Sequence, residues 1–164
     1  MSRPPLPEGF LEEHVLDSGC ENGIWWFTYD AWWIGVVNGY AYIPEDHPLH
    51  GIGYDNLHDL IDAHGGLTFS RDGWIGFDTG HAWDTWPRGL RSDPFDLPWL
   101  VDDEKDANWT PGMVSEVARS LAARVAETAV RFTAESETEH EEGTSSTGRG
   151  HPDDGVQHDH SGEA

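Results

Sequence analysis

The sequence predicts an α+β fold: an antiparallel sheet of about five strands, a short helix, and one long C-terminal amphipathic helix packed on the sheet. Two observations indicate this. Short runs rich in aromatic and β-branched residues, separated by turn residues, fill the first half of the chain, and such runs are typical of strands. A single long segment with helical apolar spacing follows them, and a helix of this kind buries its apolar face on a sheet.

The first predicted strands are residues 24–30 (IWWFTYD) and 32–37 (WWIGVV). Asn38-Gly39 follows, and both residue types tolerate positive φ, so the pair predicts a two-residue hairpin turn. The run YAYIP then returns as the partner strand and stops at Pro44.

The next segments contain a short helix and a second hairpin. Residues 54–66 (YDNLHDLIDAHGG) are interpreted as a short helix or helical turn that Gly65 ends. The runs LTFS (67–70) and WIGFD (74–78) are predicted strands that flank the turn RDG. The segment from residue 79 to 108 contains three prolines and an acidic run, and is interpreted as a loop.

The last element is a helix that begins at Pro111. Thr110 is a good N-cap, and proline suits the first helical position. Apolar residues then recur at spacings of one, three and four as far as Phe132. The opposite face carries glutamates and arginines, which predicts an amphipathic helix of roughly twenty residues.

Composition changes near residue 135 and divides the chain. Residues 135–164 contain one Val, one Ala and no larger apolar residue, too little apolar surface to offset the entropy of ordering. Residues 1–134 are therefore predicted to form a single domain, and residues 135–164 a disordered acidic tail. Cys20 is the only cysteine, which excludes an internal disulfide and argues against a cysteine-based zinc site.

The net charge of −22, from 31 acids and 9 bases, should repel phosphate backbones, so no nucleic-acid partner is expected. The acidity fits either a basic or cationic partner or a halophilic adaptation of the surface. Acids occur along the whole chain and Lys105 is the only lysine, which favours the halophilic interpretation. With no long apolar run in the sequence, we expect no membrane partner and a cytoplasmic location.

Four polar residues around the second hairpin form the candidate site. His64 precedes one strand, Asp78 ends the other, and His81 and Asp84 follow within six residues. Because a hairpin returns to its start, these side chains are expected to lie together. Two imidazoles and two carboxylates could bind Zn²⁺ or Mn²⁺, so a divalent metal is the candidate cofactor. They could also perform acid–base chemistry, or only form a structural polar network.

Nine tryptophans are many for 164 residues. Trp25-Trp26 and Trp32-Trp33 are adjacent pairs on predicted strands, so one member of each pair should pack under the helix. An aromatic-rich core explains most of them. The three nearest the candidate site are predicted to border a pocket and to stack on a ligand; they are Trp74, Trp83 and Trp86.

Several motifs resemble a family of small proteins of tailed bacteriophages and their prokaryotic hosts. The matching segments are GYAYIPEDHPLHG, YDNL, HGGLTFS and WIGFDTGHAWD, followed by the amphipathic helix. The family's His-Gly-Gly-Leu-Thr and Gly-Phe-Asp-x-x-His motifs both occur here, and the resemblance covers roughly residues 24–132. A cysteine usually follows Gly-Phe-Asp, where this chain has Thr79. The resemblance implies a viral or mobile-element context and no particular activity.

Three functions fit the sequence. The first is a protein that binds a small ligand, for instance a nucleotide-like molecule, in a pocket lined by histidine, aspartate and tryptophan. The second is a metal-dependent hydrolase that uses His64, Asp78, His81 and Asp84 to hold a cation. The third is an interaction module whose exposed aromatic residues bind another protein. Bases near the site are few, and they are Arg71, Arg88 and Arg91.

Overall fold

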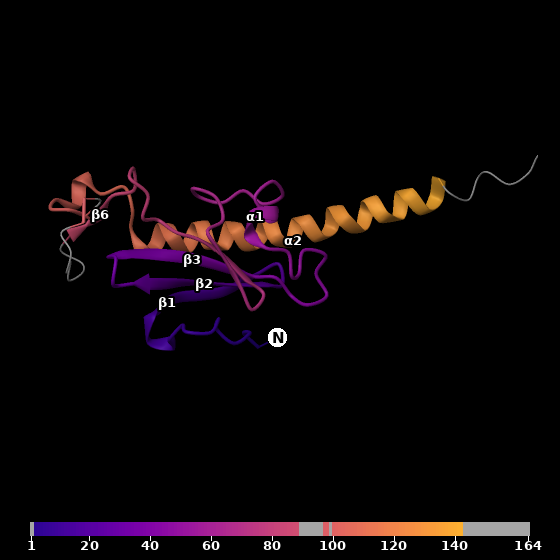
Figure 1. Cartoon of the computed structure of the whole chain (residues 1–164), viewed down its shortest axis with the longest axis horizontal. Helices are drawn as coiled ribbons and strands as arrows, with labels where there is room; N and C mark the ends of the chain where they lie inside the picture. The colour runs from indigo at the N-terminus through magenta and orange to yellow at the C-terminus, as the bar shows by residue number, and fades with distance from the viewer. Residues whose placement is uncertain (1, 89–96, 99, 143–164) are drawn as a thin grey trace, which may run out of the picture.

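The computed structural model describes residues 2–88, 97–98 and 100–142 and confirms the α+β class. A five-stranded antiparallel sheet has the strand order β1-β2-β3-β5-β4. The long helix α2 (Pro111–Glu142) runs along one face of this sheet, and the short helix α1 (Tyr54–Leu57) lies beside α2 (Figure 1). Within the described part of the chain, no helix is long and apolar enough to cross a membrane.

The first hairpin joins β1 (Val15–Glu21) to β2 (Ile24–Ala31) and was not predicted. A short 3₁₀ helix, η1 (Glu12–His14), precedes it. The turn is Asn22-Gly23, with φ of 50° and 87°, the primed geometry that matches the twist of a hairpin. β1 escapes prediction because it is an edge strand, with four of its seven residues exposed and none buried.

The predicted turn at Asn38-Gly39 is wrong, and so is the strand predicted at 32–37. Asn38 and Gly39 both lie inside β3 (Val36–Tyr42), and the chain reverses at residues 32–35 instead. Gly39 serves close packing, because a Cβ there would lie 2.5 Å from the Phe77 ring and 3.2 Å from Ala118 of α2. The glycine therefore permits the contact between sheet and helix and does not make a turn.

The second hairpin, β4 (Phe69–Arg71) with β5 (Trp74–Phe77), confirms the predicted strands LTFS and WIGFD. Asp72 and Gly73 form its turn with φ of 53° and 79°. β5 pairs with β3, which leaves β4 at the edge of the sheet. The end of β5 therefore lies beside the start of β3, and most residues of the candidate site follow β5 in the chain.

Each face of the sheet carries its own apolar cluster. Trp26 packs on the α2 side, whereas Trp25 packs with Phe27, Tyr40 and Trp74 on the other side. The prediction that this adjacent tryptophan pair divides between the faces is confirmed. The N-terminal segment covers the second face, through Leu6 and Phe10 among others. The same prediction is wrong for Trp32 and Trp33, which lie in the turn and are both exposed.

The start of α2 is as predicted, but its length is greater. Thr110 Oγ1 accepts a hydrogen bond of 3.3 Å from the Met113 amide, as an N-cap does. The helix continues past residue 134 to Glu142. The rest of the predicted acidic tail, residues 143–164, lies outside the described residues, so the tail stays a prediction.

The segment predicted as a loop from residue 79 to 108 contains two short parallel strands and a 3₁₀ helix. The strands are β6 (Trp86–Pro87) and β7 (Leu100–Val101), and the helix is η3 (Glu104–Asp106). Thr85 holds this region to the residues before α2: its carbonyl accepts from the amide of Trp109 at 3.1 Å, and its amide donates to Asn108 Oδ1 at 2.6 Å. The chain around residue 84 is thereby fixed beside the N-terminus of α2.

Candidate functional site

Asp84 is the centre of the polar cluster. Its side chain is 1% exposed. His64 Nε2 lies 2.9 Å from Oδ1 and 3.0 Å from Oδ2, and His81 Nδ1 lies 2.8 Å from Oδ2. The Trp109 indole donates to Oδ1 at 2.8 Å, and the His81 amide donates to Oδ2 at 3.2 Å. Two imidazoles and an indole thus converge on one buried carboxylate.

The His-Gly-Gly motif places His64 at Asp84. Gly65 and Gly66 have φ of 63° and 91°, conformations that glycine adopts at little cost. A Cβ on Gly65 would lie 2.1 Å from His81 Cε1, so the imidazole of His81 rests directly against the glycine backbone. The motif is therefore a packing requirement of the cluster, and a side chain at residue 65 would displace His81.

A β-turn places His81 and Asp84 together. The Asp84 amide donates to the His81 carbonyl at 2.9 Å and closes the turn. Thr79 anchors the preceding residues, because its hydroxyl donates to the Val37 carbonyl of β3 at 2.7 Å. The Trp86 indole donates to the Thr79 carbonyl at 3.0 Å. Both ends of the turn are thus tied to the folded core.

Asp78 lies beside the cluster but is not its centre. Its Oδ1 is 3.9 Å from His81 Nδ1, so the expected proximity of an imidazole to this carboxylate is present. The same oxygen accepts from the Gly80 amide at 3.0 Å. The side chain is 32% exposed, against 1% for Asp84. The hairpin argument therefore placed the four residues together, whereas the carboxylate that holds both histidines is Asp84.

Only one of the three tryptophans chosen from the sequence has an accessible face at the cluster. Trp83 is 64% exposed and stacks on His81, with ring centroids 4.9 Å apart and planes 6° apart. Trp74 is fully buried on the opposite face of the sheet, where its indole donates to the Pro5 carbonyl at 2.9 Å. Trp86 is buried in the core under α2. The assignment of Trp74 and Trp86 as ligand-stacking residues was wrong.

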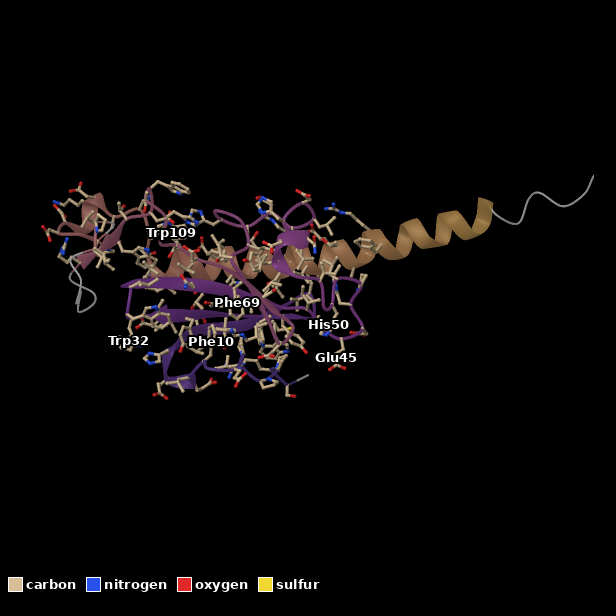
Figure 2. All side chains as sticks on the ribbon, in the orientation of Figure 1. Phe10, Trp32, Glu45, His50, Phe69 and Trp109 are labelled. Atoms are coloured by element: carbon tan, nitrogen blue, oxygen red, sulfur yellow. The ribbon has the colours of Figure 1, made fainter. Side chains whose placement is uncertain are left out.

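Sequence reasoning missed Trp109. Its ring packs against that of His64 at 4.7 Å, in addition to the hydrogen bond from its indole to Asp84. The available signal was its place directly before the N-cap Thr110. A residue there lies at the start of the helix, but the sequence does not say which loop that start faces. Figure 2 labels Trp109 on the α2 side of the sheet.

The environment of Asp84 favours its ionised form. Burial alone would raise the pKa of Asp84, but hydrogen bonds from His64, Trp109 and His81 outweigh burial and hold the pKa below its usual range. Among the described residues, no arginine or lysine lies within ion-pair distance of Asp84. The titratable groups beside Asp84 are the imidazoles of His64 and His81 and, further away, the carboxylate of Asp78.

The geometry suits a metal ion. One ligand atom from each of His64, His81 and Asp84 can be chosen so that all lie within 4.8 Å of one another. Zn²⁺ binds imidazole nitrogens and carboxylate oxygens at about 2.0–2.2 Å, and catalytic zinc sites use three protein ligands with a fourth position open. The side chains of His64 and His81 are 24% and 18% exposed, so solvent reaches the cluster.

Three hollows among the described residues lie away from this cluster. A hollow of about 200 Å³ lies between residues 51–53 and the β4–β5 turn, and Arg71 lines it. Two further hollows lie under the N-terminal segment, and both are lined by Trp25. Arg88 reaches Asp102 at 2.7 Å and the Leu100 carbonyl at 3.0 Å. Neither Arg71 nor Arg88 is placed to hold a phosphate at Asp84, and Arg91 lies outside the described residues.

Comparisons of the chain with family models, curated proteins and solved structures found no match.

Proposed function

We propose that the protein binds a divalent metal ion of the zinc class through His64, His81 and Asp84. The convergence of two imidazoles on one buried carboxylate is the observation that carries this proposal. Each histidine would give the nitrogen that now faces Asp84, and these nitrogens must lose their protons for a metal to bind. The indole of Trp109 would remain on the carboxylate and orient it, as partners behind metal ligands do.

Charge supports a metal over a purely structural network. A structural network needs the same hydrogen bonds, but it places no cation beside the buried carboxylate of Asp84. A divalent cation would balance Asp84 and the nearby Asp78 together, in a chain whose net charge is −22. Motif residues from two distant segments, His-Gly-Gly and Asp-x-x-His, meet at this cluster, which also supports a site.

The metal would supply the positive charge that an anionic small ligand needs in order to bind. The described arginines near the cluster are engaged elsewhere, so an anionic or nucleotide-like ligand would have to be held through the metal. The exposed face of Trp83 lies beside His81 and offers a stacking surface. A small molecule with an oxygen donor and a flat ring fits this combination.

Hydrolysis at the metal is a second candidate. Asp78 favours it, because its partly exposed carboxylate lies 3.9 Å from His81 and beside the proposed metal position. A bound metal lowers the pKa of its water and makes it a nucleophile near neutral pH. Asp78 could then accept a proton from that water.

Calorimetric titration of the full chain with ZnCl₂, and visible spectra with Co²⁺, test the proposal. We expect one site per chain in the wild type, with affinity reduced at least tenfold in His64→Gln and His81→Gln. His58→Gln is the matched control, because His58 is exposed and lies in the same segment near Gly66. A second control, His158→Gln with His160→Gln, removes the two histidines of the HDH sequence near the C-terminus.

Circular dichroism establishes that each variant is folded. Equal zinc stoichiometry and affinity in the wild type, His64→Gln and His81→Gln would overturn the metal proposal. Loss of binding only in the His158 and His160 variant would assign the metal to the C-terminal residues.

A further inference from the structure

Trp83 presents one face of its indole to solvent at the edge of the metal cluster. The residue is 64% exposed, although its neighbour Asp84 is 1% exposed. The other face of the indole lies on the imidazole of His81, with ring centroids 4.9 Å apart and planes 6° apart. Contact with His81 occupies only one face of the ring, so the outer face is free to stack on a ligand.

The backbone on both sides of Asp84 is held by one side chain, that of Asn108. Its Nδ2 donates to the Trp83 carbonyl at 2.9 Å, and its Oδ1 accepts from the Thr85 amide at 2.6 Å. The turn that the Asp84 amide closes on the His81 carbonyl, at 2.9 Å, holds the same residues from within. Trp83 is therefore ordered by its backbone and by its ring contact, and an ordered side chain loses little conformational entropy when a ligand binds.

The metal position and the free indole face are separated by one aromatic layer. A metal ion on His81 would lie close to the plane of the imidazole, whereas a ring on the outer face of Trp83 would lie beyond the indole. Stacked rings have centroids about 4.5 Å or more apart, so this ring would be roughly 9 Å from the imidazole of His81, given the 4.9 Å between His81 and Trp83. The ligand therefore needs a linker of several atoms between its metal-binding oxygen and its ring.

The charges around the cluster restrict the other end of the ligand. Among the described residues, no arginine or lysine lies within ion-pair distance of Asp84, so an anionic group at the cluster would be held by the metal. A single phosphate monoester carries a charge of about −2 near neutral pH, which one divalent ion can offset. A nucleic-acid strand carries many more charges, and the net charge of −22 repels it.

We propose that Trp83 determines specificity for a nucleoside monophosphate, whose phosphate binds the metal and whose base stacks on the outer face of the indole. The sugar supplies the linker between these two groups. Aromatic side chains stack on any nucleobase, because every base has a flat face. This inference rests on the proposed metal site, and it adds the class of ligand and the residue that distinguishes that ligand from other phosphates.

Three ligands with one phosphate each test the proposal by calorimetric titration of the zinc-loaded full chain, after the zinc content of each protein has been measured. Adenosine monophosphate has the phosphate, the linker and the base. Ribose phosphate lacks the base, and phenyl phosphate has a ring but lacks the linker. We expect adenosine monophosphate to bind the wild type at least about fivefold more tightly than either of the others, the lower end of what stacking of a base on an aromatic side chain contributes.

Variants of Trp83 show whether the indole causes this preference. In Trp83→Leu the preference for adenosine monophosphate over ribose phosphate should disappear, whereas Trp83→Phe should retain part of it. Trp32→Leu is the matched control, because Trp32 is a 52% exposed tryptophan in the turn between β2 and β3, and this variant should keep the full preference.

The outcomes separate this inference from the metal proposal. Zinc binding by a wild type that shows no preference among the three ligands, or a preference that survives in Trp83→Leu, would overturn the inference and leave the metal site in place. An equal loss of preference in Trp32→Leu would also overturn it. Absence of zinc from the wild type after loading would overturn both proposals.

Discussion

Asp84 is a buried carboxylate with four hydrogen-bonding groups around it, and no arginine or lysine is among its described neighbours. Indole and imidazole donors stabilise its ionised form, so its pKa lies below the usual range although burial opposes this. Hydrogen bonds to a charged group contribute more than neutral ones. The residue is therefore both the structural centre of the cluster and the strongest candidate ligand in it.

Asp84→Asn should lower the free energy of unfolding by about 2–4 kcal/mol near pH 7, because the amide group cannot accept all the hydrogen bonds that the carboxylate accepts. A depressed pKa stabilises the folded state above the unfolded pKa of about 3.9 and loses that contribution as pH falls through the folded pKa. The difference between variant and wild type should therefore narrow below about pH 4. Urea unfolding over a pH series measures this difference in the free energy of unfolding. Asp62→Asn, 88% exposed, is the control and should change little; a difference that stays constant down to pH 2 contradicts the assignment.

The residues of the site were predictable as a group but not in their roles. Hairpin geometry correctly brought His64, Asp78 and His81 together, since β4 and β5 return the chain to its start. The β-turn from His81 to Asp84 directs Asp84 inward, and the sequence does not encode that direction in its spacing. Trp109 joins from 25 residues further along the chain, a distance over which sequence periodicity carries no information.

At the scale of elements, apolar patterns predicted buried strands and the helix better than they predicted turns. Two Asn-Gly pairs occur, and only Asn22-Gly23 makes a turn. At Asn38-Gly39 the packing of Phe77 and α2 against the glycine decides the conformation. This packing is a tertiary contact, so the local sequence does not reveal it. β1 was missed because an exposed edge strand lacks apolar alternation.

Thr28 gives a test of the sheet under α2. It is fully buried in β2, opposite Gly39, and its hydroxyl has no hydrogen-bond partner among the described residues. Valine has nearly the same shape and removes the unsatisfied group, so Thr28→Val should raise the free energy of unfolding by about 1–2 kcal/mol. Thr79→Val is the matched control: that hydroxyl donates to Val37 at 2.7 Å, so its loss should destabilise by about 1 kcal/mol or more. Equal destabilisation by both substitutions, measured by chemical unfolding, would contradict this account.

At the scale of the molecule, the histidine cluster is packed against the start of α2, where the Trp109 indole donates to Asp84. The overall charge of −22 would support a metal ion at this cluster through long-range attraction.

The same charge makes stability depend on salt. Residues 135–164 carry nine acids and one arginine, a net of −8, so residues 1–134 carry −22 + 8 = −14. Exposed carboxylates in the folded chain repel one another, and salt screens them as the Debye length falls from about 10 Å at 0.1 M to about 3 Å at 1 M. The free energy of unfolding should therefore rise with KCl over this range, as measured by thermal or urea unfolding.

The variant Glu13→Gln, Glu45→Gln, Asp59→Asn removes three exposed charges. It should be more stable than the wild type at 0.1 M KCl, and its free energy of unfolding should rise less steeply with KCl. A gain that continues at several molar would come from exclusion of salt from apolar surface. A flat or falling curve below 1 M would contradict the halophilic interpretation and leave a basic partner as the reason for the acidic surface.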